Sequence, residues 1–276
     1  MKAVPEVSVI IPTYNRLPFL REAIASVQNQ TYRDFELIVV DDGSTDSTAE
    51  FVRTLPEAVV YLHQENAGPS AARNRGIRAA RGAFLTFLDS DDLWQPRKLE
   101  IQMAFMHAQP AAVVCYTDEI WIRRGVRVNP RKKHRKYGGW IFERCLPLCI
   151  VSPSSVLMRR RFFDVVGLFD ETLPACEDYD LWLRGALHFP FHFMAEKLIV
   201  KRGGHADQLS RQWGLDRYRV QALLKLLQNP ALTAEQRKLV QTQLVEKCRI
   251  LELGCRKRGK HDEADRYRRC ARRFAS

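Results

Sequence analysis

The sequence contains no apolar run that could cross a membrane. A membrane-spanning helix needs about 20 consecutive apolar residues, and no stretch of the 276 residues approaches that length. Residues Met1–Glu6 also lack an apolar segment followed by a cleavage site, so we expect no secretory signal. These absences predict a cytoplasmic protein, either free or held peripherally at the inner face of a membrane.

Two familiar phosphate-binding motifs are missing as well. No GxxxxGK[ST] sequence is present, which argues against a P-loop nucleotidase. No GxGxxG follows the first predicted strand, which argues against the usual dinucleotide-binding fold. A bound phosphate would therefore need a metal ion and basic side chains to balance its charge.

Cysteine does not occur in paired patterns. The seven cysteines are odd in number, scattered along the chain and include no CxxC pair. Reduced thiols in a cytosolic protein are therefore the expected state.

What the sequence does contain is a regular alternation of strand and helix signals. Short apolar runs at 7–11, 35–40, 59–63 and 84–88 alternate with segments whose apolar residues recur at helical spacing, and further strands are predicted at 152–158 and 198–200. This order predicts an α/β protein with a mostly parallel, doubly wound sheet. Each predicted strand ends in polar residues, and ligands of open parallel sheets gather at those ends.

The stretch 84–92 runs from a predicted buried strand straight into three carboxylates, Asp89, Asp91 and Asp92. Three anions within four residues repel one another unless a cation or solvent relieves them. Carboxylate oxygens suit a hard divalent ion, so Mn or Mg is the expected cofactor. The alternative is a helix start, with an aspartate as N-cap and acids in the first turn.

Five motifs in this order resemble those of a known enzyme family. They lie at 9–15, 39–44, 66–74, 88–92 and 176–184 and read VIIPTYN, VVDDGS, NAGPSAARN, LDSDD and CEDYDLWLR. Together they resemble the family-two glycosyltransferases, inverting sugar transferases of the GT-A fold, over roughly residues 5 to 210. The resemblance implies a Rossmann-like, mixed but mostly parallel sheet with helices on both faces.

The resemblance also implies a nucleotide site, with a UDP-sugar as the expected donor. Thr13 and Tyr14 fall where the family's first loop touches the nucleobase. Asp41 falls where a carboxylate accepts a hydrogen bond from the base, typically uracil, and Arg73 where a basic side chain lies near base and phosphate. The alternatives are a turn-and-cap cluster for Asp41 and Asp42, and a solvated helix-face charge for Arg73.

The metal residues follow from the same resemblance. Asp89 and Asp91 match the two acids of the family's D-x-D motif, with Asp89 as the ribose and metal-network contact and Asp91 as the direct metal ligand. His205 matches a histidine that lies close to the metal or diphosphate in many relatives. The alternative for His205 is an ordinary loop residue after two glycines.

Glu177 and Asp178 are the candidate catalytic pair. An inverting transfer needs one carboxylate to take a proton from an acceptor hydroxyl, and adjacent helical residues point about 100° apart, so both cannot face the same atom. The resemblance places the base at Asp178, with Glu177 as a supporting acid. The alternative is a pair of acids stabilised by the dipole at a helix N-terminus.

Positive charge is concentrated in two segments. The net charge is +12, and an excess of nine positive charges lies in residues 214–276, which we predict to be a basic helical extension (213–276) after a GT-A domain (1–212). Such an extension suits an anionic membrane surface, nucleic acid, or merely solvent. Residues 123–136 are also basic and predict an exposed hairpin or mobile loop over the acceptor side, or a solvated loop.

The function that these observations predict is an inverting glycosyltransferase. It would move a sugar from a UDP-sugar to the hydroxyl of a glycan or lipid-linked acceptor in bacterial-type cell-surface glycan synthesis. An alternative is a membrane-surface or nucleic-acid binding module on the same fold, but such a protein would have lost Asp41, Asp91 or Asp178, and all three are present. A two-metal nucleotidyltransferase is disfavoured by the Glu177–Asp178 motif. Nucleic acid is therefore not expected as a partner.

Overall fold

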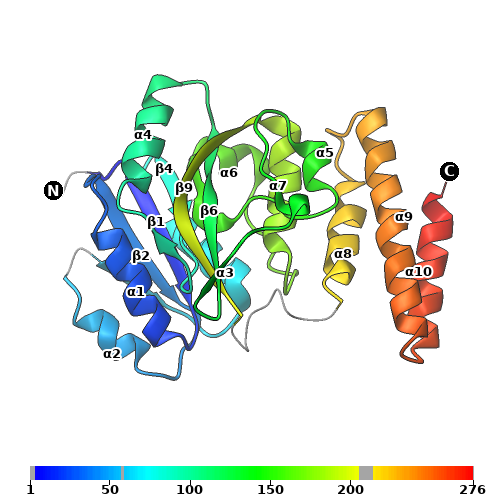
Figure 1. The fold of residues 1–276 in the computed structure, drawn as a ribbon, viewed down its shortest axis with the longest axis horizontal. Coiled ribbons are helices and arrows are strands. Elements are labelled where there is room, and N and C mark those ends of the chain that lie inside the picture. Colours follow the sequence, from blue (N-terminus) through cyan, green and yellow to red (C-terminus); the bar gives the residue numbers. More distant parts are fainter. Residues whose placement is uncertain (1–3, 57–58, 205–213, 276) are drawn as a thin grey trace.

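The computed structural model describes residues 4–56, 59–204 and 214–275. Figure 1 shows one twisted sheet with helices on both faces, and a group of helices beyond it at the C-terminal end. The sheet has nine strands in the order β3-β2-β1-β4-β8-β6-β9-β5, with β7 paired to β6 alone. The strands are β1 (Val7–Thr13), β2 (Phe35–Asp41), β3 (Val59–His63), β4 (Phe84–Phe87), β5 (Leu93–Trp94), β6 (Val114–Arg123), β7 (Val126–Val128), β8 (Val156–Arg159) and β9 (Phe191–Gly203).

The helices alternate with the strands in the first half of the chain and gather at its end. They are α1 (Leu17–Gln28), α2 (Thr48–Arg53), α3 (Gly68–Ala79), α4 (Lys98–Ala108), α5 (Phe142–Cys145), α6 (Arg161–Val166), α7 (Glu177–His188), α8 (Asp216–Leu226), α9 (Ala234–Arg256) and α10 (His261–Phe274). Two short 3-10 helices, η1 (Lys132–His134) and η2 (Pro153–Ser155), complete the set.

The predicted fold class is confirmed. β1, β2, β3 and β4 pair in parallel, as the alternating pattern requires. β8 then pairs antiparallel with both β4 and β6, while β6 and β9 are parallel. The sheet is therefore mixed, with parallel pairing from β3 through β4 and antiparallel pairing on both sides of β8.

The sheet separates two buried clusters because alternate residues of a strand point to opposite faces. In β1, Val9 and Ile11 belong to one cluster, which the apolar faces of α1 and α4 cover. Ile10 belongs to the other, which α3, α6 and α7 cover. The carboxyl ends of β1, β2 and β4 are thus held between two packed layers.

Two predicted strands differ from the structure. Residues 152–158 were expected to form one strand, but they begin as η2, and β8 starts at Val156. Pro153 has a fixed φ and no N–H for a ladder, and the N–H and hydroxyl of Ser155 both bond the carbonyl of Ser152. The expected strand at 198–200 is the centre of the longer β9, because ladder bonds to β6 extend it through polar residues.

The C-terminal helices pack on the sheet domain rather than standing apart from it. α9 begins with a capping box, in which Thr233 and Gln236 satisfy each other's backbone N–H. Val220 and Leu244 belong to the same buried cluster as Trp182 of α7, so removing these helices would expose a core. The division at residue 213 remains a prediction. Within the described ranges, no helix is both long and apolar enough to span a membrane.

The basic segment 123–136 begins as a hairpin. β6 and β7 are joined by Arg124 and Gly125, both with positive φ, as a tight hairpin turn requires. Its far end is buried: the side chain of Lys136 is 6% exposed and pairs with Glu119 at 3.0 Å. The segment is therefore an exposed hairpin that is anchored at Lys136.

Candidate active site

The predicted site residues lie at strand ends and helix starts along one edge of the sheet. Asp41 ends β2, Asp89 follows β4, and Glu177 opens α7. Parallel pairing of β2, β1 and β4 brings the first two to the same edge. Residues that are distant in sequence therefore meet in the place where ligands of α/β sheets bind.

Asp41 and Asp42 are both buried and hydrogen-bonded within the protein. Asp41 accepts the Ser44 N–H at 2.8 Å and the Tyr61 hydroxyl at 2.6 Å. Asp42 accepts the N–H groups of Ala67 and Gly68 at 2.9 and 2.8 Å, at the start of α3. These contacts are those of a turn-and-cap cluster, and base recognition by Asp41 stays a prediction.

Thr13 ends β1 beside this cluster, Tyr14 follows it, and the two residues differ in exposure. Thr13 is 3% exposed, and its buried hydroxyl has no hydrogen-bond partner among the described residues. Tyr14 is 46% exposed. A buried hydroxyl without a partner is costly in a folded protein, so a ligand bonded to Thr13 would remove that cost. Contact of Thr13 and Tyr14 with a nucleobase stays a prediction.

Arg73 links two acids that lie far apart in the sequence. It is 5% exposed, so the alternative of a solvated charge is wrong. Its Nη2 donates to Asp89 Oδ1 and its Nη1 to Glu177 Oε1, both at 2.7 Å. Burial lowers the pKa of Arg73, but the two carboxylates outweigh that effect and raise it. One buried guanidinium thus joins three of the five motifs.

The other two acids after β4 point to different partners. Asp91 pairs with Arg16 Nη1 at 2.9 Å. Asp92 is 2% exposed and accepts the Ser154 hydroxyl at 2.7 Å and the Arg202 N–H at 3.0 Å. Burial, reinforced by the charges of Asp91 and Asp89, holds the pKa of Asp92 well above its ordinary value. Asp92 therefore links the loop after β4 to Ser154 and to β9.

The carboxylates after β4 fit a divalent ion whose remaining ligands would come from water and substrate. Within the described ranges, no group of three His, Cys, Asp or Glu side chains converges as a ready-made metal cage. Mg and similar ions commonly keep several waters and bind through one or two carboxylates together with substrate phosphates. Asp91, whose side chain is 13% exposed, and Asp89 are suitable oxygen donors. His205 lies outside the described residues.

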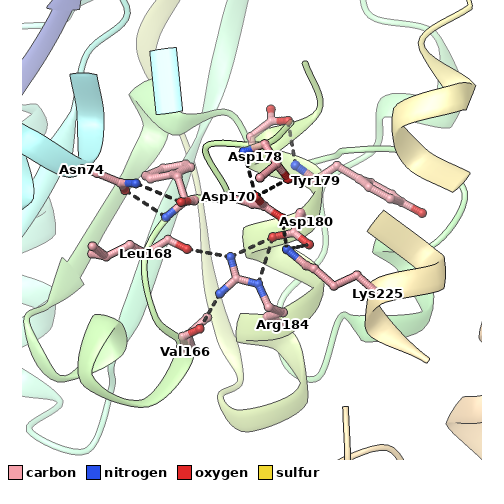
Figure 2. Close-up of polar contacts among 11 residues, drawn as sticks. Asn74, Val166, Leu168, Asp170, Asp178, Tyr179, Asp180, Arg184 and Lys225 are labelled. Carbon is pink, nitrogen blue, oxygen red and sulfur yellow. Dashed lines mark hydrogen bonds and ion pairs between the residues drawn. The ribbon is translucent and has the colours of Figure 1, made fainter. Parts of the chain in front are cut away.

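Three acids open α7, and their surroundings separate their roles. Burial raises the pKa of Glu177, although Arg73 opposes that shift. Asp180 is 2% exposed and pairs with Arg184 at 2.8 Å and Lys225 at 2.7 Å. Figure 2 shows this pairing, with Arg184 also reaching backbone carbonyls of the preceding loop. Asp180 therefore anchors the helix, while Asp178 has no ion-pair partner in the part of the chain that the structure describes.

The sequence did not single out several residues that the structure brings to the site. Arg16 and Ser154 contact the Asp89–Asp92 loop. Lys201 donates to the Ser152 hydroxyl at 2.8 Å; burial lowers the pKa of Lys201, but nearby carboxylates, including Asp178, outweigh that effect and raise it. Only Arg16 had a sequence signal, because it directly follows the first motif.

A comparison with known proteins places this arrangement in a family. The sequence model described as glycosyl transferase family 2 matches residues 8–167, which is more than half of the chain. The chain belongs to glycosyl transferase family 2. The match covers the motifs at β1, β2, α3 and β4, and the α7 acids lie beyond it.

Relatives of this chain are named as glycosyltransferases. A putative colanic acid biosynthesis glycosyl transferase of Escherichia coli K12, WcaA, is 31% identical over 208 residues, covering 68% of this chain and 69% of the relative. A glycosyltransferase of Rickettsia felis is 32% identical over 215 residues. That match covers 75% of this chain but only 36% of the relative. The chain thus spans little more than a third of the length of this relative.

Solved structures show the same fold. The Staphylococcus aureus TarS fragment 1-349 in complex with UDP-GlcNAc aligns with a TM-score of 0.69 over 97% of this chain and 92% of that one, at 18% identity. The mannosyltransferase PcManGT of Pyrobaculum calidifontis, in complex with GDP-Man and Mn2+, aligns with a TM-score of 0.63 over 100% of this chain and 77% of that one, at 19% identity. At these identities the likeness establishes the GT-A fold.

Proposed function

We propose that this family 2 chain is an inverting, metal-dependent glycosyltransferase that moves a sugar from a UDP-sugar to an acceptor hydroxyl. The observation that carries the proposal is the Arg73 bridge, which joins Asp89 on the donor side to Glu177, next to the candidate base. The names of the E. coli relative and of the TarS complex support a UDP-sugar donor and cell-surface glycan synthesis.

Asp178 is the proposed base. The acceptor hydroxyl gives its proton to Asp178, and its oxygen forms a bond to the anomeric carbon. The bond from that carbon to the diphosphate breaks, and the electron pair leaves with UDP. Glu177, held by Arg73 at 2.7 Å, keeps the start of α7 beside the donor loop. In-line attack by this route inverts the anomeric configuration.

Asp91 and Asp89 would hold the divalent ion, Mn or Mg, together with the diphosphate. When bound, the ion stabilises the charge that develops on the leaving group. Arg16 lies next to Asp91 at 2.9 Å and adds positive charge on the same side. The Mn2+ complex of PcManGT supports the choice of a divalent ion.

UDP is expected to bind only when Mn or Mg is present, and Asp91→Asn should abolish most of that metal dependence. The reason is that no P-loop holds the phosphates, so a divalent ion held by carboxylates must supply much of the positive charge. Calorimetry against a nucleotide panel, with each metal and with chelator, measures this. Asp164→Asn, an exposed acid on α6, is the control. Equal UDP affinity with and without chelator would exclude the metal role.

We also propose that the enzyme works in the cytoplasm with a glycan or lipid-linked acceptor, in peripheral contact with an anionic membrane. The outer face of α9 carries exposed Ile250 and Leu253, at 51% and 61%, beside the exposed cations Arg249, Arg256 and Lys257. Exposed aliphatic side chains among cations suit an anionic lipid surface, which offers both negative charge and apolar depth. Nucleic acid would use the cations alone or with aromatic residues.

The double variant Ile250→Glu, Leu253→Glu should lower co-sedimentation with phosphatidylglycerol vesicles by about tenfold or more, because it removes apolar contact and adds two repelled charges. Val165→Glu, an equally exposed aliphatic position on α6 at 53%, should bind as wild type does. Binding should also weaken with salt. Unchanged co-sedimentation of the double variant, or binding that salt does not affect, would contradict the membrane contact.

A further inference from the structure

The three acids that open α7 are held by different kinds of group. Glu177 and Asp180 are paired with arginine or lysine side chains, whereas among the described residues Asp178 has no cation at ion-pair distance. The carboxylate of Asp178 is held by neutral donors. Its Oδ2 accepts the thiol of Cys149 at 3.2 Å, and its Oδ1 accepts the backbone N–H of Tyr179 at 2.7 Å.

The loop that carries Cys149 is held by hydrogen bonds from three other parts of the protein. Three side chains donate to backbone carbonyls of residues 146–150: Tyr179 Oη to Leu146 at 2.6 Å, Lys247 Nζ to Pro147 at 2.9 Å, and Lys136 Nζ to Ile150 at 2.8 Å. These side chains come from α7, from α9 and from the end of the basic segment. Helix α9 and the basic segment therefore both help to hold the loop of the thiol in place.

The thiol is suited to donate a hydrogen bond and should react only slowly as a nucleophile. Burial, and next the negative charge of Asp178, raise the pKa of Cys149 well above its ordinary value. The sulfur therefore keeps its proton at neutral pH. Two acceptors lie within reach of that proton: Asp178 Oδ2 at 3.2 Å and the carbonyl oxygen of Val151 at 3.3 Å from the sulfur.

We propose that Cys149 is a positioning residue that orients the carboxylate of Asp178 for proton abstraction. The inference rests on the proposed role of Asp178 as the base. A general base needs a fixed direction and also needs to keep its affinity for a proton. A paired cation would fix the direction but would stabilise the ionised carboxylate and weaken the base. A thiol is a weak donor, so it orients the carboxylate at little cost in basicity.

The first test measures UDP release from UDP-hexoses with water as the acceptor, so no unidentified acceptor enters the assay. Cys149→Ala should lower kcat roughly fivefold, the effect of losing one hydrogen bond, and leave UDP affinity unchanged. Cys149→Ser keeps a donor and should recover most of the rate. Cys145→Ala, a nearby buried cysteine without a bond to Asp178, should behave as wild type does. Cys149→Ala should cost nothing further in an Asp178→Asn background, because the group that it orients is gone.

The second test needs no turnover and follows the rate of Cys149 alkylation by iodoacetamide, measured by peptide mass spectrometry. Asp178→Asn should speed it severalfold, because removing the neighbouring charge favours the thiolate, while Cys145 in the same molecule stays unchanged. Equal alkylation rates in wild type and Asp178→Asn, or a Cys149→Ala loss that is the same in both backgrounds, would overturn the inference. If Asp178→Asn itself releases UDP at the wild-type rate, the proposed base is wrong instead.

Discussion

Asp178→Asn is expected to bind UDP and metal as the wild-type protein does and to transfer sugar about 10²–10⁴-fold more slowly, the usual cost of removing a positioned base. The amide keeps the size of the side chain but cannot take the acceptor proton. Donor binding should survive because the proposed metal and phosphate residues lie after β4, on a different element from α7. The measurement is initial rate and UDP affinity side by side, with acceptors found by screening lipid-linked and soluble glycans.

Glu177→Gln is the matched control for this prediction. One oxygen of its carboxylate is bonded to Arg73, which holds Glu177 away from the role of base, and the variant should retain more activity than Asp178→Asn. Analysis of the product adds an independent check, because inversion requires the acceptor to attack from the side opposite the diphosphate. Wild-type transfer by Asp178→Asn, or a product that keeps the donor's anomeric configuration, would show that the base is elsewhere or that the reaction is of another type.

Arg73→Met is expected to destabilise the protein by about 3–5 kcal/mol, the usual cost of leaving buried carboxylates without their partner. Glu177 is 6% exposed, and the Asp89 side chain is 27% exposed, so neither can recover full hydration. For a chain of this size the loss corresponds to a melting temperature lower by roughly 10 °C. Thermal unfolding with and without UDP and metal measures it.

Arg78→Met provides the comparison on the same helix. Its partner Glu171 is 3.6 Å away and both side chains are about half exposed, so the loss should be under about 1 kcal/mol. Adding Glu177→Gln to Arg73→Met should restore part of the stability, because it removes one of the two stranded charges. If Arg73→Met melts no lower than Arg78→Met, the bridge does not stabilise the site.

The sequence predicted the fold class because its signals are local. The alternating apolar runs at β1 to β4 and the helical spacing between them depend only on neighbouring residues. β9 was underestimated because its polar residues carry no apolar pattern, and pairing with β6 depends on backbone bonds between distant segments. The strand predicted at 152–158 begins only at Val156. Pro153 and the bonds from Ser155 to Ser152 form a turn before the apolar residues of the strand.

The sequence also determined by itself the family to which the chain belongs, because the motifs contain the residue types of that family in its order. It could not determine which of those side chains are available to a ligand and which are bonded to other residues of the protein. Whether Arg73 faces solvent or two acids, and whether Asp92 binds an ion or a serine, depends on residues between 16 and 104 positions away in the sequence. The thiol beside Asp178 had no signal at all, since Cys149 lies in an unremarked loop. Only tertiary packing decides such contacts. Buried polar groups are generally hydrogen-bonded, and the partner of each is a group that the fold brings within reach.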